Sequence, residues 1–390
     1  MMEMRYIAKD IPLWQVTIWD KKFNNVDKKW QPKTIKYKYL LSDELDSLRV
    51  DDGDVRILYT GKDVGFTTEE LAGDRLSEGE IISIPWGGIP TVKYHKGKFV
   101  TGDNRIATSK DINKLTNKYL YYFMRGNIHE IASYYRGASL KHPCMKDILK
   151  MTISYPSVQE QDKICGQFDV LEQIIEVRKQ ELQLLDDLIK ARFVEMFNLS
   201  DCIYKSLGEC TDFVDYRGHT PELSDEGIIR MVNAKSVGKG FFKYVDEFVT
   251  EETYDAWMHR GFGYPGDILF VTEGHTFGNT CLIPEDMTKF ALGQRVITIK
   301  GKEEIKNAFL CSYMQTDMFW KDINVYRTGG TAQGIRSKDL VKVMVPIPPI
   351  EQQIEFVRFV HKVDKSKVAV QKALDETQLL FDSLMQKYFG

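Results

Sequence analysis

The sequence lacks the marks of membrane and secreted proteins. No apolar run approaches the roughly eighteen residues of a membrane span, and the opening MMEMRYIAKD has no apolar signal stretch. Its six cysteines include no C-x-x-C pair, so neither a disulfide framework nor a zinc site is indicated. We therefore expect a cytoplasmic protein, without membrane association, whose thiols are free.

Catalytic motifs are also missing. There is no GxxxxGK[ST] phosphate loop, no [ND]PP[YF] motif for methylating an exocyclic amine, and no HExxH metal site. The Pro348–Pro349 pair lacks the flanking residues of the methylation motif, so we interpret it as the entry to a helix. The sequence predicts a chain that is not an enzyme and that holds no metal and no cofactor of its own.

An excess of positive charge is absent as well. The 390 residues include 53 Lys and Arg against 56 Asp and Glu, a net charge of −3. Residues 1–155 hold 25 cations and 20 acids, whereas residues 199–347 hold 17 cations and 21 acids. Binding to nucleic-acid phosphates must therefore be local, and the charge of the second region argues against it, because counterion release needs cations that face phosphates.

The chain does contain an internal repeat. Residues 137–197 align without a gap on residues 329–389, at a constant offset of 192. Upstream, GEIISIPWGG (79–88) resembles GDILFVTEGH (266–275), and DNRIAT (103–108) resembles GQRVIT (293–298). The repeat predicts the order module, helix, module, helix, with modules over residues 1–155 and 199–347 and long helices over residues 156–198 and 348–390.

Heptad spacing of apolar residues marks both predicted helices. In the first, Phe168, Ile175, Leu182, Ile189 and Met196 recur every seven residues, and the second repeats this phase between residues 356 and 388. Because the first helix must end where the second module begins, and the second must lead back, we predict that they pair antiparallel. The alternative is that each apolar stripe lies on its own domain.

The modules show a mixed pattern. Strand-like runs such as RILYT, KFVTG, DILFV and RVITI are bounded by Gly, Pro and Asp, and helical spacing of apolar residues marks residues 117–126 and 307–323. The predicted fold class is α+β: two mixed α/β domains, related by a pseudo-twofold rotation and separated by an antiparallel two-helix coiled coil.

Loops of both modules supply candidate DNA contacts. Two equivalent modules on a stiff spacer suit a ligand with two separated sites, such as a DNA duplex. Arg, Lys and Gln bind base edges, and Ser and Thr hydroxyls bind phosphates. The first-half candidates are Trp86, Lys93, Lys96, Tyr135, Arg136, Ser139 and Lys141. The second-half candidates are Arg217, His219, Thr220, Lys235, His275, Thr276, Arg327, Thr328, Thr331, Gln333 and Arg336. For each residue, the alternative is an ordinary solvated turn.

The junction of each module with its helix is the most specific part of the sequence. RGASLKHPCMKDILKMTISYPSVQEQ (136–161) and RTGGTAQGIRSKDLVKVMVPIPPIEQQ (327–353) share a Gly/Ser/Thr turn, a Lys-Asp segment, a strand ending in Pro, and an EQ motif before the helix. These segments resemble the close of each half of type I restriction-modification specificity subunits. PGDILFVTEGHTFGN also resembles that family, whereas the start of the first module departs from its pattern.

The resemblance implies a function in DNA methylation and host defence. In that family, each target recognition domain reads one half of a split, asymmetric sequence in double-stranded DNA, and the helix pair sets the spacer. The resemblance also implies two methyltransferase subunits on the outer faces of residues 159–197 and 351–389, which bring S-adenosylmethionine, and restriction subunits that need ATP and Mg. We expect the methyltransferase partners to supply much of the phosphate contact. The alternative function is a duplicated coiled-coil scaffold that binds no nucleic acid.

Overall fold

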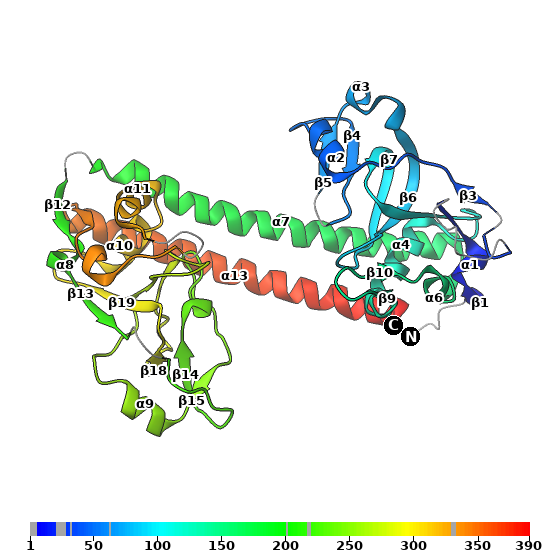
Figure 1. Ribbon diagram of the computed structural model, residues 1–390. Helices are drawn as coiled ribbons and strands as arrows, with labels where there is room; N and C mark the ends of the chain where they lie inside the picture. The colour runs from blue at the N-terminus through cyan, green and yellow to red at the C-terminus, as the bar shows by residue number, and fades with distance from the viewer. Residues whose placement is uncertain are drawn as a thin grey trace. The chain divides into compact units, whose positions relative to one another are not determined.

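The chain forms two compact units. The computed structural model describes residues 6–20, 29–31, 33–61, 64–199, 202–216, 220–328 and 333–390. One unit comprises Met1–Val177 with Ala373–Gly390, and the other comprises Arg178–Lys372. Each unit therefore holds one mixed domain and one segment of each long helix, α7 (Val158–Met196) and α13 (Ile350–Phe389) (Figure 1). The division into four consecutive segments stays a prediction.

The first domain is built on a seven-stranded sheet whose central strand is covered on both faces. Within β6, Ile82 and Ile84 belong to one buried cluster and Ile81 to another, as the alternation of side chains along a strand requires. The spatial order is β3 (Thr34–Ile35), β2 (Thr17–Asp20), β8 (Asn104–Ser109), β6 (Ser77–Pro85), β7 (Lys93–Thr101), β4 (Val55–Leu58) and β5 (Val64–Thr67).

Shorter elements complete this domain. Strand β1 (Tyr6–Pro12) pairs with β11 (Thr152–Pro156), and β9 (Tyr135–Arg136) pairs with β10 (His142–Pro143). The predicted helix over residues 117–126 is α4 (Asn117–Gly126), which begins where Thr116 Oγ1 accepts the Tyr119 amide at 3.2 Å. The other helices are α1 (Leu13–Val16), α2 (Ser42–Leu48), α3 (Glu69–Ala72), α5 (Ile128–Ser133) and α6 (Met145–Ile148), with the 3-10 turn η1 (Gly73–Arg75).

The second domain divides its strands between sheets of four and three. The four-stranded sheet has the order β13 (Thr211–Asp215), β19 (Val296–Gly301), β16 (Ile268–Val271) and β17 (Thr280–Leu282). The three-stranded sheet has the order β15 (Phe248–Val249), β14 (Ile229–Val232) and β18 (Phe290–Leu292), and β12 (Ile203–Ser206) pairs with β20 (Met344–Ile347). As in β6, residues of β16 alternate between two buried clusters.

The helices of the second domain correct one prediction. The single helix predicted over residues 307–323 is wrong, because the structure has α10 (Asn307–Tyr313) and α11 (Asp317–Tyr326). Thr316 separates them: its Oγ1 donates to the Tyr313 carbonyl at 2.7 Å and accepts the Phe319 amide at 3.4 Å, so it starts a new helix. The remaining elements are α8 (Leu207–Cys210), α9 (Glu251–Trp257), α12 (Ser337–Leu340) and the 3-10 turn η3 (Ala234–Ser236).

The two long helices pair antiparallel within each unit, as predicted. In the second unit, Asp186 of α7 pairs with Lys367 of α13 at 2.5 Å, and the Phe193 ring lies 5.5 Å from that of Phe356. In the first unit, the Phe168 ring lies 5.2 Å from that of Phe381. Lys367 interrupts the apolar seam of the second helix, and its ion pair with Asp186 accommodates this polar side chain.

A buried glutamine joins each long helix to the domain before it. Gln161 accepts the Thr116 amide at 2.9 Å and donates to the carbonyls of Lys114 and Pro156 at 2.7 and 2.9 Å. Gln353 makes the same three kinds of bond, with the Lys306 amide at 2.8 Å and with the carbonyls of Glu304 and Pro348 at 3.0 and 2.8 Å. Both side chains are fully buried. This glutamine, which occupies the same position of the repeat in both halves, therefore fixes the start of each helix.

Candidate nucleic-acid interface

Each domain places a glycine-containing loop directly after its central strand. Residues 86–89 follow β6 in the first domain, and residues 273–278 follow β16 in the second. The Gly88 amide donates to the Lys141 carbonyl at 3.3 Å, and the Gly274 amide donates to the Gln333 carbonyl at 2.9 Å. In both domains, two candidate loops that are far apart in the sequence are therefore hydrogen-bonded to each other.

An aromatic and cationic stack forms the first-domain site. The Trp86 carbonyl is 2.7 Å from His142 Nδ1, the two rings lie 5.3 Å apart, and the Arg105 guanidinium lies 4.7 Å from the Trp86 ring. Arg105, which is 1% exposed, pairs with Asp20 at 3.0 Å and with Asp103 at 2.6 Å. The Trp86 ring therefore packs on an arginine that Asp20 and Asp103 hold in place.

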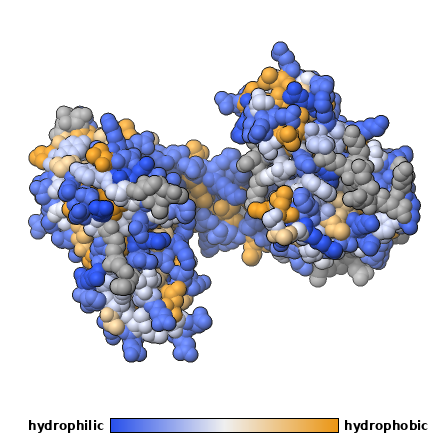
Figure 2. Space-filling view, in the orientation of Figure 1, coloured by the Kyte–Doolittle hydropathy of each residue, from blue (hydrophilic) through white to orange (hydrophobic). Residues whose placement is uncertain are grey.

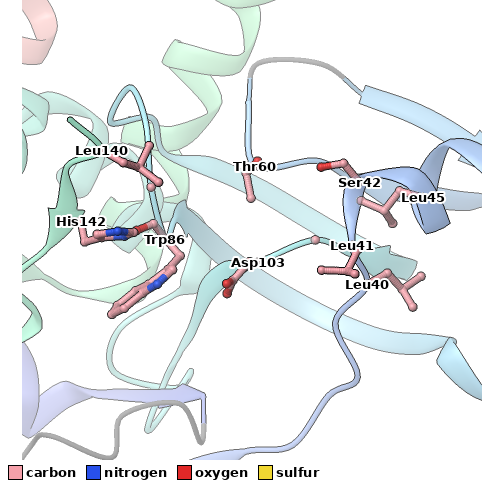
Figure 3. A pocket seen from close by; sticks show the side chains of 11 residues that line it. Leu40, Leu41, Ser42, Leu45, Thr60, Trp86, Asp103, Leu140 and His142 are labelled. Carbon is pink, nitrogen blue, oxygen red and sulfur yellow. The ribbon is translucent and has the colours of Figure 1, made fainter.

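A cavity of about 280 Å³ opens beside this stack (Figure 3). Aliphatic side chains from the start of α2 and from the loop before β10 face it, together with Trp86, Asp103 and His142. Its lining residues are Leu40, Leu41, Ser42, Leu45, Thr60, Trp86, Gly87, Gly102, Asp103, Leu140 and His142. The segment from Leu40 to Leu45 was not among the sequence-predicted site residues, because its apolar pattern is that of a core helix.

Two first-domain candidates are directed into the protein. Tyr135 is 5% exposed and its hydroxyl donates to the Pro85 carbonyl at 2.7 Å, and burial raises its pKa above the ordinary value. Lys93 is half-buried and its Nζ donates to the Tyr59 carbonyl at 2.5 Å. Both side chains support the loops of the site from within the domain.

The other first-domain candidates lie at the surface. Lys96 is exposed, with Nζ 3.9 Å from Glu80, and Arg136 is exposed but paired with Asp147 at 2.7 Å. Ser139 and Lys141 are exposed on the loop that meets Gly88. Ser139 and Lys141 therefore lie beside the Trp86 loop in space.

Second-domain candidates gather around the 273–278 loop. His275 is exposed and Thr276 half-buried on the loop itself. Thr328 and Gly334 exchange backbone hydrogen bonds at 2.8 and 3.0 Å, and the Ile335 amide donates to the Thr272 carbonyl at 2.9 Å. These bonds hold the segment with Arg327, Thr328, Gln333 and Arg336 against the loop.

The remaining second-domain candidates are placed differently. Lys235 is exposed but forms an ion pair with Glu247, which holds the pKa of that carboxyl below its ordinary value. Thr220 is exposed in the segment before β14. Arg217, His219 and Thr331 lie outside the described residues.

The charges of the second domain are unevenly neutralised. Lys205, Arg230, Lys235, Lys289, Arg295 and Lys342 each pair with a carboxylate. Among the described residues of this domain, no carboxylate pairs with Lys239, Lys243, Arg327 or Arg336. All four of these are on segments hydrogen-bonded to the 273–280 region. The negative net charge of the domain therefore coexists with a local group of free cations.

Groups that suggest other chemistry are few. Across the described ranges, no cluster of three or more His, Cys, Asp or Glu side chains has the geometry of a metal site. No helix in these same ranges is long and apolar enough to cross a membrane. The six cysteines are free, and burial raises the pKa of Cys165 and Cys311 to about 12, so their thiols stay protonated.

Comparison with known proteins identifies the family. The model described as Type I restriction modification DNA specificity domain matches residues 46–186 and again residues 213–377. The chain belongs to the type I restriction-modification DNA specificity family. The two matches fall on the two halves of the internal repeat, so each half of this family member carries one copy of the domain.

Two relatives agree with this membership. The chain is 22% identical over 340 residues to the Escherichia coli type I restriction enzyme EcoDI specificity subunit, covering 77% of this chain and 74% of that protein. It is 24% identical over 280 residues to the E. coli EcoR124I/EcoR124II specificity subunit, covering 67% of this chain and 66% of that protein.

The fold is shared with solved structures. The S subunit of a type I restriction-modification system from M. genitalium matches with a TM-score of 0.61 at 17% identity, covering 100% of this chain and 97% of that one. A structure described for complex assembly and conformational transition of the type I R-M system matches with a TM-score of 0.52 at 15% identity, covering 99% and 98%. The predicted fold class, with two repeated α/β domains and a two-helix coiled coil, is confirmed.

Proposed function

We propose that this member of the DNA specificity family reads a bipartite, asymmetric sequence in double-stranded DNA, one half-site with each domain. The two domains are residues 1–155 and 199–347, and the helices over residues 156–198 and 348–390 set the unread spacer. The chain supplies specificity and no bond-making step, and acts in the cytoplasm, where its DNA target is.

The observation that carries the proposal is the repeated loop pair. In each domain, the glycine-containing loop after β6 or β16 is hydrogen-bonded to the loop that precedes α6 or α12, respectively. Glycine permits close approach of backbone to a ligand, and the partner loops present Ser139 and Lys141 or Arg327 and Arg336 to solvent. Two copies of one surface with different side chains fit a target whose halves differ in sequence.

The free cations of the second domain support this proposal against the objection from net charge. Affinity for DNA depends on cations that face phosphates, so a domain with a negative total still binds when its unpaired cations gather on one surface. Carboxylate pairing occupies other cations of the domain, such as Lys205 and Lys289. We still expect partner subunits to add phosphate contacts.

Two methyltransferase subunits are proposed to dock on the long helices. Besides the buried seam, α7 carries a second apolar stripe at heptad spacing, in which Val170, Val177 and Leu184 are 56%, 53% and 67% exposed. Figure 2 shows hydrophobic patches within a mainly hydrophilic surface on the face in view, including over the long helices. Exposed stripes of this kind mark protein interfaces. The partners would bring S-adenosylmethionine, and restriction subunits with ATP and Mg would join through them.

Methylome sequencing tests the function. Cells that express the chain with its methyltransferase should carry methylation at a bipartite motif, and a chimera in which residues 199–346 come from a relative should change one half of the motif only. The other half is the internal control. Methylation without a motif, or a motif unchanged by the exchange, would contradict the proposal and favour a scaffold that does not bind nucleic acid.

Substitutions on the second stripe test the docking surface. Val177→Asp and Leu184→Asp place a charge on an exposed apolar position, so we expect loss of methyltransferase in co-purification with little change in the stability of the chain itself. Gln183→Ala, exposed on a different face of the same helix, is the matched control. Retention of methyltransferase by both Asp variants would exclude this face of α7 as the docking surface.

A further inference from the structure

A tight turn in the second domain, which the sequence-based site did not include, exposes an aromatic ring between two lysines. We call residues 237–244 the Lys239 turn. Val237 and Phe242 form an antiparallel bridge, and the Gly238 amide donates to the Phe241 carbonyl at 2.8 Å. Gly240 has a φ of +85°, a conformation that other residues rarely adopt, so the chain reverses directly after Lys239. Lys239 therefore lies at the tip.

Hydrogen bonds attach this turn to the candidate DNA-binding loop. The Gly240 amide donates to the Thr280 carbonyl at 2.8 Å, and Asn279 Nδ2 donates to the Val237 carbonyl at 3.0 Å. Asn279 and Thr280 directly follow the 273–278 loop. The turn is thus continuous with the surface on which the proposed function depends.

The side chains of the turn alternate between the core and solvent. Phe242 is half-buried and packs on the cluster that contains Val237, whereas Phe241 is 53% exposed. Lys243 Nζ lies 5.4 Å from the centre of the Phe241 ring. The Phe241 ring lies over Gly238 of the same turn, and the half of the ring that stays in solvent is available to a ligand.

The lysines of the turn differ from the cations next to it. Within the described residues, Lys239 and Lys243 pair with no carboxylate, whereas Arg230 pairs with Asp246 at 3.2 Å and Lys235 pairs with Glu247. Protein interfaces are depleted in lysine, whereas phosphates are neutralised by lysine and arginine. An exposed ring between two free lysines fits a nucleic-acid ligand better than a protein ligand.

We propose that the Lys239 turn is a further DNA-binding element of the second domain, in which Lys239 and Lys243 contact phosphates and Phe241 makes apolar contact with base edges in the adjacent groove. This inference rests on the proposed function and extends it beyond the two loops shared with the first domain. It also assigns part of the phosphate contact to a domain whose net charge is negative.

Salt-dependent binding of the full chain with its methyltransferase tests the inference. The probe is a labelled duplex with the motif found by methylome sequencing, and a scrambled duplex measures selectivity. We expect the K239A/K243A double variant to bind at least tenfold more weakly at moderate salt and to lower the slope of log affinity against log salt by about 1.8, since each phosphate contact contributes about 0.9. We expect F241A to lose about tenfold in affinity with an unchanged slope, because an apolar contact releases no counterion.

Matched controls come from the same domain. Lys321→Ala removes an exposed lysine of α11, and Phe262→Ala removes a phenylalanine that is 44% exposed. Both should bind within twofold of the unaltered chain, and all variants should keep the same thermal midpoint.

The outcomes separate the two proposals. If the unaltered chain and the controls select the motif while the turn variants keep both affinity and slope, the role of the turn is wrong and the proposed function stands. If the turn variants instead lose methyltransferase, the turn is a protein-docking surface and the inference is overturned. If the unaltered complex shows no selectivity, both proposals fall.

Discussion

The two domains share the hydrogen bonds that position their loops and differ in the side chains on and beside those loops. Asn117 in the first and Asn307 in the second each accept a backbone amide, of Ser109 at 2.7 Å and of Gly301 at 2.6 Å. Each also donates to a carbonyl, of Glu80 within β6 at 3.0 Å and of Gly266 just before β16 at 2.8 Å. On these loops, Trp86 occupies the position that the repeat gives to Glu273. Arg105 is buried, whereas its counterpart Arg295 pairs with Glu273 at 2.9 Å in solvent. The shared asparagine hydrogen bonds position the loops, whereas the side chains on the loops, such as Trp86 and Glu273, differ between the domains.

The largest expected effect separates the two arginines. Arg105→Met leaves Asp20, which is 1% exposed, without its cation, so we expect a loss of about 3–5 kcal/mol in the free energy of unfolding. Arg295→Met removes a pair whose side chains are 53% and 50% exposed, and we expect less than about 1 kcal/mol. Urea denaturation of the full chain measures both. Equal losses would show that the two domains use this arginine in the same way.

A smaller and symmetrical effect is expected at the glutamines that fix the helices. Gln161→Ala and Gln353→Ala each remove three hydrogen bonds made by a fully buried side chain, so each should lower the free energy of unfolding by about 2–4 kcal/mol. The exposed Gln183→Ala and Gln378→Ala are controls within about 0.5 kcal/mol. A large loss in the free energy of unfolding at only one of the two buried glutamines would show that the helix starts are not equivalent in the two domains.

The smallest effect is a pH dependence confined to the second domain. Burial raises the pKa of Asp267 above its ordinary value, although the Tyr264 amide and Asn307 oppose the shift. The folded state therefore disfavours the ionised carboxylate, and this cost disappears as the pH falls through the raised pKa. The free energy of unfolding of the unaltered chain, minus that of Asp267→Asn, should therefore increase as the pH is lowered from about 7 to about 4. A constant difference would contradict the assignment.

Features that repeat along the sequence were predictable. The offset of 192 placed the long helices in equivalent positions, the upstream match with small insertions did the same for the glycine loops, and heptad spacing indicated the antiparallel pair. The break at Thr316 was missed because the apolar spacing continues through it, and only the hydroxyl hydrogen bonds show that a new helix starts there.

Features set by tertiary packing were not predictable. Tyr135 and Arg136 are neighbours in a polar segment, yet Tyr135 is buried against the Pro85 carbonyl and Arg136 is exposed. The Lys239 turn was missed for the same reason: GKGFFK becomes a candidate only when hydrogen bonds to Asn279 and Thr280 place it beside the 273–278 loop. Sequence repeats thus predict the order of helices and loops, whereas the direction of a single side chain depends on partners far along the chain.

The position of Phe389 has a consequence for the order of events during synthesis. This residue is 8% exposed, packs 5.2 Å from the Tyr119 ring, and its carbonyl accepts a hydrogen bond from Asn127, which lies 262 residues earlier. The core of the first domain therefore remains open on the ribosome until the last turns of α13 have emerged. The domain that is translated first is completed last.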